Sequence, residues 1–453
     1  MVSVGQHENI ELLSYSEVAE VSGYVGNFQV KVRKKARYVD EDLCTGCGLC
    51  EEKCPAKKIP SEFNLGLGTR KAIYRPFRQA VPSTPVLDKE HCIYFQRGKC
   101  RACEKLCPRQ AIDFEQQDRT LELEVGTIIL ATGYDPFDPS HAPQFGYGLD
   151  NVLTGLEFER LISADGPTEG KVLLKDGNPP QSIAILHCIG SRDEQYNAYC
   201  SRVCCMYSLK FAHVARETTG ARVYQVYRDM RAFGKGYEEF YTKVEHEGVV
   251  FIRRDEDIEV AQQDGQLLVK ARDVFSGEKV ELPVDMVVLG VGIEPRQDAG
   301  EVARLFGIGC GHAGFFTERH PKLAPVETAS DGIFIAGACQ GPKDIPDTVA
   351  QAGAAAVAAL DMIDLGVVEL EPIASFIDEE VCSGCRTCIG LCPYHAIEFV
   401  RLNGKGVSRV NEVLCKGCGT CVSACPSGAA TQRGFVDRQI YAEIEGALSV
   451  AID

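Results

Sequence analysis

The sequence lacks several features that would assign it to common classes of protein. It has no apolar run long enough to cross a bilayer, and Gln6, His7 and Glu8 do not fit a basic-then-apolar signal peptide. It also lacks a basic excess, since 48 Lys and Arg stand against 64 Asp and Glu, a net charge of −16. This charge disfavours nucleic acid and anionic membranes as main partners. We therefore expect a cytoplasmic protein without a membrane span.

Cysteine, in contrast, is abundant. The chain of 453 residues contains 22 cysteines, which fit no secreted disulfide scaffold of this length. In a cytosolic protein such cysteines indicate metal ligands. Sixteen of them fall into four motifs, and each motif ends in Cys-Pro.

The C-terminal pair of motifs has the spacing C-x2-C-x2-C-x3-C-P of two-cluster bacterial ferredoxins. In such ferredoxins three closely spaced thiolates hold one [4Fe-4S] cluster and the fourth reaches the neighbouring cluster. Zinc sites use paired C-x2-C units instead. This crossed rule predicts two ligand sets: Cys382, Cys385, Cys388 and Cys425 for one cluster, and Cys415, Cys418, Cys421 and Cys392 for the other.

Residues 36–117 contain a second pair of motifs, which predicts an inserted two-cluster ferredoxin domain. Its second motif is stretched, because eight positions separate Cys92 from Cys100. The crossed rule again predicts two sets: Cys44, Cys47, Cys50 and Cys107 for one cluster, and Cys92, Cys100, Cys103 and Cys54 for the other.

The remaining segments read as α/β structure. Residues 1–35 predict a β-hairpin, and residues 127–134 and 332–339 each predict a buried strand that ends at a glycine. An alanine-rich helix should follow, with Asp344 or Asp347 as its cap and Pro346 in its first turn. Within residues 151–292, strands at 182–186, 222–227 and 249–253 and a helix at about 201–216 predict a parallel, doubly wound sheet.

Two features of residues 151–292 leave alternatives open. Nicotinamide binding would need G-x-G-x-x-G after the first strand, but only Gly190 is present there, so this function is poorly supported. Cys200, Cys204 and Cys205 lie near the predicted helix start, and a spacing of four places Cys200 and Cys204 on one helical face. These three are either buried small residues or ligands of a further cluster that needs a fourth ligand.

Several motifs together resemble the A subunit of heterodisulfide reductase, the flavin-containing subunit of methanogens and related bacterial complexes. The resemblance covers nearly the whole chain. Its motifs are Gly23–Phe28, Cys44–Pro55, Cys188–Asp193, Asp229–Gly236 and Gly341–Pro346. It implies a thioredoxin-reductase-like two-domain flavoprotein core with one inserted and one C-terminal two-cluster ferredoxin domain, FAD, and [4Fe-4S] clusters, with four expected and a fifth as a candidate.

The resemblance also implies a domain order. We expect FAD-domain segments at 1–35, 118–150 and 293–370, the inserted ferredoxin domain at 36–117, and a nicotinamide-type α/β domain at 151–292. The C-terminal ferredoxin domain should cover 371–432, followed by a tail at 433–453. Family members carry a G-x-G-x-x-G flavin fingerprint before the point that corresponds to Met1, so we expect an incomplete FAD domain here. Either a separate polypeptide or an upstream extension of this chain would complete it.

The same resemblance suggests flavin contacts and partners. The expected contacts are Thr132, Gly133, Gly337, Ala338, Cys339, Lys343, Asp344 and Ile345. Ala338 stands where thioredoxin-reductase-like proteins have aspartate, which puts the usual ribityl contact in doubt. The expected function is electron transfer between FAD and clusters in a soluble, hetero-oligomeric, electron-bifurcating complex. Its expected partners are ferredoxin, related reductase subunits and a hydrogenase-, formate- or NADH-linked input subunit. The alternative is a flavin-free electron-transfer and docking module. No catalytic acid–base residue is evident.

Overall fold

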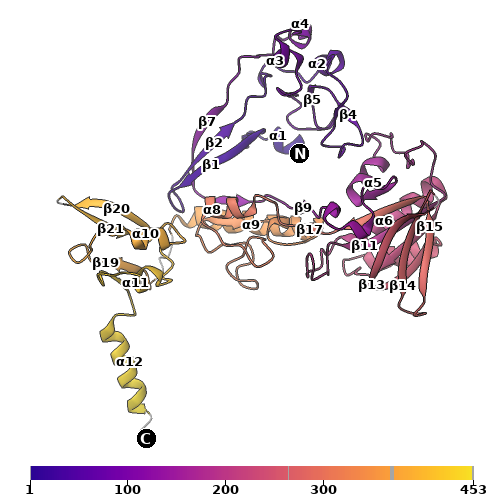
Figure 1. Ribbon diagram of the computed structural model, residues 1–453. Helices are drawn as coiled ribbons and strands as arrows, with labels where there is room; N and C mark the ends of the chain where they lie inside the picture. The colour runs from indigo at the N-terminus through magenta and orange to yellow at the C-terminus, as the bar shows by residue number, and fades with distance from the viewer. Residues whose placement is uncertain (1, 264, 368–371, 403, 451–453) are drawn as a thin grey trace. The chain divides into compact units, whose positions relative to one another are not determined.

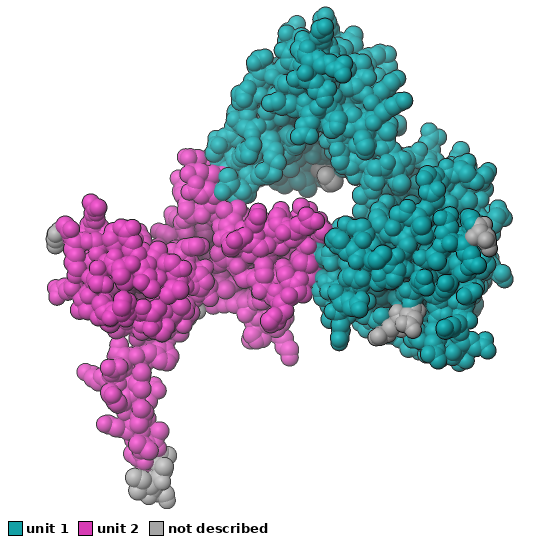
Figure 2. Space-filling model, in the orientation of Figure 1, with its two compact units in different colours: residues 1–19, 32–121, 136–294 teal, residues 20–31, 122–135, 295–453 magenta. Residues whose placement is uncertain are grey.

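The computed structural model describes residues 2–263, 265–367, 372–402 and 404–450 (Figure 1). Figure 2 shows its two compact units. Unit 1 contains residues 1–19, 32–121 and 136–294, and unit 2 contains residues 20–31, 122–135 and 295–453. Each unit therefore combines segments that lie far apart in the sequence. The predicted boundary at 370/371 lies outside the described residues.

The largest element of unit 1 is a seven-stranded sheet of order β10-β16-β11-β12-β13-β14-β15. Its strands are β10 (Val152–Thr154), β11 (Ser182–Ile189), β12 (Arg222–Tyr227), β13 (Val250–Gln263), β14 (Gln266–Asp273), β15 (Lys279–Val284) and β16 (Met286–Val291). The first five strands of this order pair in parallel, whereas β13, β14 and β15 pair antiparallel. The sheet is therefore mixed, and the prediction of a parallel, doubly wound sheet is wrong in this respect.

Alternation along β11 explains how the two faces of this sheet are covered. Ile183 and Ile185 pack with residues of α5 (Gly155–Ile162), α6 (Cys204–Thr219) and α7 (Tyr237–His246). Ala184 and Leu186 point to the opposite face and pack with apolar residues of β13–β15 and with Phe137. Because side chains alternate along a strand, helices cover one face and the antiparallel strands cover the other.

The inserted ferredoxin segment of unit 1 has short elements around a small core. They are α2 (Leu49–Lys53), β3 (Ile59–Pro60), β4 (Thr69–Arg70), β5 (Ile73–Tyr74), β6 (Val86–Leu87), α3 (Ile93–Arg97) and α4 (Ala102–Leu106). The core contains Val39, Ile73, Leu87 and Ile112 together with several of the motif cysteines. The cysteine motifs are thus part of the packing of this segment.

The predicted β-hairpin within residues 1–35 is confirmed, and both of its strands lie between Ser16 and Lys34. β1 (Ser16–Ser22), β2 (Phe28–Lys34) and β7 (Arg119–Val125) form a three-stranded sheet. The turn between β1 and β2 needs Gly23, whose φ is 87°, and a Cβ there would lie 2.1 Å from the carbonyl oxygen of Asn27. Other short elements are α1 (Val2–Gly5), β9 (Asp135–Pro136), η1 (Pro139–His141), η2 (Pro143–Phe145) and β17 (Ile293–Glu294).

Unit 2 contains the two predicted strands that end at a glycine. β8 (Ile128–Leu130) and β18 (Ile333–Ile335) pair in parallel, and η3 (Gly337–Cys339) follows β18. Helix α9 (Ile345–Leu365) then packs Ala355 and Ala359 against Phe334. Its N-cap is Asp344, whose carboxylate accepts a hydrogen bond of 2.9 Å from the Asp347 backbone N–H. Of the two predicted caps, Asp344 is therefore the correct one. Unit 2 also contains α8 (Ala299–Phe306).

Helix α9 corrects one expectation from the sequence. By length and composition it could cross a membrane, although we expected no such segment. The many alanines make it apolar without a run of large side chains. A single helix of this kind is weak evidence for a membrane span, because core helices of globular proteins have the same composition.

The C-terminal ferredoxin domain of unit 2 has the expected α+β character. Two antiparallel pairs, β19 (Ser375–Ile377) with β22 (Ala430–Gln432) and β20 (Ile397–Leu402) with β21 (Lys405–Val410), accompany α10 (Thr387–Leu391) and α11 (Thr420–Ser423). Helix α12 (Asp437–Val450) follows in the predicted tail.

Candidate functional site

The cysteines of the inserted ferredoxin segment line two cavities in unit 1. One cavity is lined by Cys44, Cys47, Cys50 and Cys107. The other is lined by Cys54, Cys92, Cys100 and Cys103. Each set is one that the crossed rule predicts, and Cys92 joins its set in spite of the stretched motif.

The C-terminal domain repeats this arrangement in unit 2. Cys392, Cys415, Cys418 and Cys421 line one cavity. Of the remaining four, Cys382 and Cys425 belong to one apolar cluster with Val407 and Ala429. These contacts likewise group each closing cysteine with the motif across from its own.

The surroundings of these thiols suit a cluster that brings its own positive charge. Burial raises the pKa of Cys50 and of Cys103 to about 12, so both thiols keep their protons until iron replaces them. Backbone N–H groups already point at sulfur, as from Gly46 to Cys44 Sγ at 3.4 Å and from Ala111 to Cys107 Sγ at 3.3 Å. Within the described part of the chain, no three His, Cys, Asp or Glu side chains converge as closely as a single metal ion requires.

A further group of cysteines lies at the carboxyl end of β11 in unit 1. Cys188, Cys204 and Cys205 are buried and Cys200 is partly buried. The Cys204 thiol hydrogen-bonds to Cys188 and to Cys205. Hydrogen bonds of its neighbours hold Cys200 beside the turn that follows Cys188. Ser201 N–H donates to Ser191 Oγ at 3.2 Å, and Arg192 N–H donates to Tyr199 O at 2.9 Å. Four thiols therefore gather where the sequence indicated three.

Local backbone geometry brings this group together. The register of β11 shifts between Leu186 and Ile189, and Cys188 has a φ of 60°. Such a bulge turns the Cys188 side chain toward the start of α6, which is where Cys204 and Cys205 lie. Arg202, with a φ of 62°, ends the loop before the helix. Cys200 thus precedes α6, and the prediction that it shares a helical face with Cys204 is wrong.

Hydrogen bonds set the proton affinities within this group. Donation by the Cys204 thiol lowers the pKa of Cys188 and of Cys205, and it raises the pKa of Cys204 itself. Complete burial acts to lower the pKa of His187, but interactions with Cys205 and Gln225 raise it. These interactions favour the thiolate forms of Cys188 and Cys205, and the thiolate is the form that binds iron.

Cys188 is the ligand candidate that sequence reasoning missed. It lies twelve positions before Cys200, so no local spacing connects the two. The available signal was a cysteine directly after a predicted buried strand, at the point where a parallel sheet presents its functional residues.

The residues expected to contact flavin lie together at one edge of the β8–β18 pair. Because these strands are parallel, the turns at Thr132–Gly133 and at Gly337–Cys339 follow the same edge. Gly133 and Gly337 have φ values of 79° and 81°, which favour glycine. The N-terminus of α9, with its free N–H groups, begins nearby at Asp344–Ile345. The residues expected to contact flavin are therefore brought together by this strand pair and by the start of α9.

Lys343 has a structural role in this region. Its ammonium donates to Gly337 O at 2.7 Å, to Gln340 Oε1 at 2.9 Å and to Gly341 O at 3.0 Å. The side chain therefore holds the loop between β18 and α9 in place. Any effect on flavin would act through the shape of this loop and through the positive charge behind it.

The turn after β11 differs from a nicotinamide site. A Cβ on Gly190 would lie 2.2 Å from the ring of Phe137, so this ring covers the glycine. The side-chain amide of Asn197 also donates to Gly190 O at 2.9 Å. A pyrophosphate must approach the backbone of this glycine closely, and the Phe137 ring occupies that space.

We accordingly expect NADH and NADPH to bind this chain weakly or not at all. Titration of the cluster-loaded protein with NADH, followed by nucleotide fluorescence, should show no saturation in the micromolar range. A nicotinamide-dependent flavoprotein reductase measured in parallel provides the positive control. Micromolar binding that is lost when Gly190 or Ser191 is changed would contradict this expectation.

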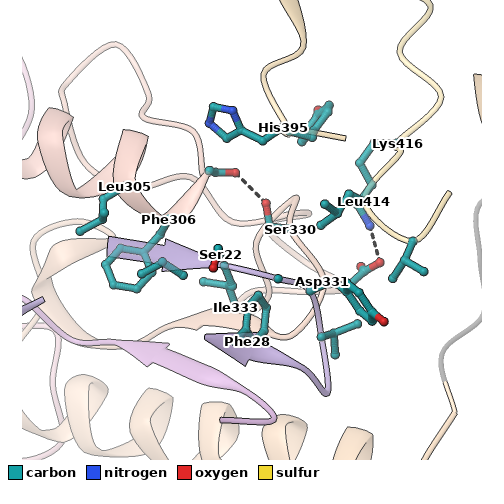
Figure 3. Close-up of a pocket in the computed structure, with 17 residues that line it drawn as sticks. Ser22, Phe28, Leu305, Phe306, Ser330, Asp331, Ile333, His395, Leu414 and Lys416 are labelled. Carbon is teal, nitrogen blue, oxygen red and sulfur yellow. Dashed lines mark hydrogen bonds and ion pairs between the residues drawn. The ribbon is translucent and has the colours of Figure 1, made fainter. Parts of the chain in front are cut away.

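A pocket of about 230 Å³ in unit 2 adjoins the cluster loop that starts at Cys415 (Figure 3). Its walls include Phe28, Phe306, Tyr394 and His395. Lys416, next to Cys415, forms an ion pair with Asp331, the residue before Gly332 and β18. Figure 3 shows this pair at the wall of the pocket. The pair fixes a cluster-bearing loop to the segment that carries the candidate flavin contacts.

Replacing Asp331 should lower the stability of unit 2 more than replacing Lys416. The side chains of Lys416 and Asp331 are only 12% and 14% exposed. Asp331→Ala leaves a buried ammonium without its carboxylate, and should destabilise unit 2 by about 2 kcal/mol. Lys416→Ala should cost about 1 kcal/mol, because Asp331 keeps Arg319 at 3.4 Å.

Denaturant unfolding of the cluster-loaded protein measures both changes. The matched control is Arg409→Ala, which removes the exposed pair with Glu379 and should change stability by less than about 0.5 kcal/mol. If the Asp331 and Lys416 variants both lose as little stability as the control, this ion pair does not hold the Cys415 loop against the segment before β18.

Three family models match the chain. A 4Fe-4S dicluster domain covers residues 375–431, a 4Fe-4S binding domain covers residues 37–57, and a pyridine nucleotide-disulphide oxidoreductase domain covers residues 205–356. They agree with the ferredoxin-type cysteine motifs and with the thioredoxin-reductase-like α/β core.

Curated relatives match nearly the whole chain. The A subunit of H(2):CoB-CoM heterodisulfide,ferredoxin reductase from Methanothermobacter marburgensis is 50% identical over 99% of this chain and 67% of its own length. The iron-sulfur A subunit of CoB–CoM heterodisulfide reductase from Methanocaldococcus jannaschii is 49% identical over 99% and 68%, and the second such A subunit of Methanopyrus kandleri is 53% identical over 99% and 68%. This chain thus spans about two thirds of their length, and it belongs to the family of heterodisulfide reductase A subunits, which are iron–sulfur oxidoreductase subunits.

Proposed function

We propose that this chain passes electrons between FAD and [4Fe-4S] clusters in a cytoplasmic heterodisulfide-reductase-like complex, in flavin-based electron bifurcation. The observation that carries the proposal is the grouping of the motif cysteines. Three cavities are each lined by four cysteines, and each set combines three ligands of one motif with the last cysteine of its partner. This is the arrangement of two-cluster ferredoxins.

A fifth cluster is part of this proposal. Its ligands would be Cys188, Cys200, Cys204 and Cys205, which gather at the carboxyl end of β11. A dinucleotide would bind at that end of the sheet in a nicotinamide-dependent reductase. The cysteines and the Phe137 ring support cluster binding in place of nicotinamide.

The proposed flavin site combines residues of this chain with a segment from outside it. FAD, when bound, exchanges electrons with other redox centres both in pairs and singly. On this chain Thr132, Gly133, Gly337, Ala338 and Cys339 would line it, and the N-terminus of α9 would face its electron-rich ring. Lys343 would keep their loop in shape. The pyrophosphate would need a glycine turn supplied from outside the described residues.

The partners follow from the relatives. The relatives are named as subunits, and their names include hydrogen, formate and ferredoxin. We propose the corresponding partners here: further reductase subunits, an electron-input subunit linked to hydrogen or formate, and ferredoxin. An NADH-linked input subunit is proposed from the family resemblance alone. The acidic surface implied by a net charge of −16 would favour partners with basic contact patches.

The alternative function is electron transfer without a flavin of its own. The two-stranded β8–β18 pair favours it for the chain taken alone, because a flavin domain needs a larger sheet. The chain would then act as a conductor and docking module between partners.

Iron, sulfide and flavin analysis of the anaerobically purified chain tests both functions. Five clusters require about twenty iron atoms per chain. Cys188→Ser should lose about four of them, whereas Cys310→Ser, at an exposed cysteine outside every motif, should lose none. Bound FAD without any partner would exclude the flavin-free alternative. Iron far below about sixteen atoms per chain after cluster reconstitution would contradict both functions.

A further inference from the structure

Two arginines interact with cysteines of the four-cysteine site of unit 1, and a third, Arg228, interacts with both of them. Arg192 follows the bulge that carries Cys188, Arg228 follows β12, and Arg254 lies in β13. Arg254 is 3% exposed, which is rare for a guanidinium. These positions bring permanent positive charge to the carboxyl end of the sheet, beside the cysteines.

Hydrogen bonds fix two of these arginines to the backbone of the site. Arg254 Nη2 donates to His187 O at 3.0 Å, directly before Cys188. Arg228 Nη1 donates to Arg192 O. These two bonds orient the guanidinium groups against the backbone beside the cysteines.

Arg192 has the most direct relation to the ligands. Its charge interacts with both Cys188 and Cys200. Its Nη2 pairs with Asp229 Oδ2 at 2.8 Å, and Asp229 also pairs with Arg253 at 2.6 Å. Among the described residues, the buried Arg192 Nη1 and Arg228 Nε have no hydrogen-bond partner. A buried N–H without an acceptor is costly, which points to an acceptor that arrives with a ligand.

Among the described charged groups that interact here, arginines outnumber aspartates. Asp193, Asp229 and Asp255 interact with the arginines, and Arg192, Arg228, Arg253 and Arg254 oppose them. Burial and then repulsion from Arg228 lower the pKa of Arg254 to about 10, as expected for a guanidinium in a positive environment. An anion at the four thiols would relieve this repulsion.

We infer that Arg192, Arg228 and Arg254 form a cationic shell that raises the reduction potential of the cluster held by Cys188, Cys200, Cys204 and Cys205. This inference rests on the proposed fifth cluster. A [4Fe-4S] cluster with four thiolates is a dianion, and one electron makes it a trianion. Fixed positive charges stabilise the more negative state more strongly, and charge and hydrogen bonds around the sulfurs set such potentials.

Backbone donors act in the same direction. The Arg202 N–H donates to Cys200 Sγ at 3.3 Å, and the Arg231 N–H donates to Cys205. The ferredoxin-type sites differ, because Arg75 near Cys44 and Cys50 is paired with Glu51 at 2.7 Å. The arginine shell would thus stabilise the reduced state of the fifth cluster more than the surroundings of the ferredoxin-type sites stabilise theirs.

The test is an EPR-monitored redox titration of the full-length, cluster-loaded protein. Subtracting the spectrum of Cys188→Ser isolates the signal of the fifth cluster. In Arg192→Gln and Arg228→Gln, the ratio of reduced to oxidised cluster at a fixed potential should fall about tenfold, which is about 59 mV for one electron. Asp229→Asn should shift the midpoint in the opposite direction, and Arg192→Lys should retain most of the wild-type value.

The matched control is Arg222→Gln in the same domain. Arg222 is exposed and begins β12, at the opposite end of the sheet and about 20 Å from Cys188. It should leave the midpoint unchanged. If the Arg192→Gln protein does not hold the cluster, the midpoint potential of Arg228→Gln alone tests the arginine shell.

The outcomes separate the two levels of the proposal. If Cys188→Ser removes no EPR signal and no iron, the fifth cluster itself is wrong. If it removes a signal whose midpoint is the same in Arg192→Gln, Arg228→Gln and Arg222→Gln, the cluster stands and the arginine shell is wrong.

Discussion

Replacing Cys392 by serine should remove the cluster bound mainly by Cys415, Cys418 and Cys421, and should leave the cluster of its own motif in place. The reason is the cavity that Cys392 lines together with those three residues. The Ala396 N–H also donates to Cys392 Sγ at 3.3 Å, which fixes the direction of this side chain. Iron should fall by about four atoms per chain.

Two exposed ligands provide the reference spectra for this experiment. Cys418→Ser and Cys385→Ser each remove a cysteine from the middle of one motif, so each defines the EPR signal of one cluster. The spectrum of Cys392→Ser should match that of Cys418→Ser, and the spectrum of Cys425→Ser should match that of Cys385→Ser. The opposite matching would show that each motif completes its own cluster. Cys310→Ser again serves as the unchanged control.

The second large effect concerns FAD. The chain should bind FAD tightly only together with a segment that supplies a strand, a glycine-rich turn and a helix, whether on the same polypeptide or on a partner. Helix α9 exposes Val349, Val357, Leu360 and Ile363, which successive spacings of eight, three and three place near one face. Globular proteins rarely leave such a face in water, and in the described part of the chain the parallel β8–β18 sheet has two strands, fewer than a stable sheet usually has.

This expectation can be tested with a charge on the exposed face. Val357→Glu and Leu360→Glu should hardly change the stability of the chain alone, because their side chains are 66% and 57% exposed. In the assembled protein the same changes should weaken FAD binding about tenfold or more, since a buried charge costs well over about 1 kcal/mol. Glu445→Ala, on α12, provides a surface control. Stoichiometric FAD in the lone chain would contradict the expectation.

Local spacing predicted which of the motif cysteines lie together around a cavity. In every ferredoxin-type motif except the stretched one, the three ligands of one cluster lie within a few residues, so their geometry follows from the chain itself. The same holds for the Asp344 cap and for the strands that end at Gly133 and Gly337, because these depend on neighbouring residues. Pairing the last cysteine of each motif with the other cluster rested on one general rule, and the cavities agree with it.

Features that depend on distant residues were harder to predict. Cys188 joins Cys204 and Cys205 only through the parallel pairing that places the end of β11 beside the start of α6. The positive φ of Arg202, which moves Cys200 out of the helix, has no sequence signal, because arginine rarely adopts it. Residues 254–284 carry many charges and were not recognised as the antiparallel part of the sheet, because their apolar positions meet a core built by Phe137 and β11.

The crossed cysteine sets have a consequence for the connectivity of the chain. In the C-terminal domain, the link from Cys388 to Cys425 encloses the link from Cys392 to Cys415, so two closed loops are nested. Each closure removes conformational entropy from the unfolded chain, as a disulfide of similar span does. Iron loading therefore acts as a pair of nested cross-links. Oxidative loss of one cluster removes one loop closure and leaves the other in place, so damage in this domain should proceed in two separate steps.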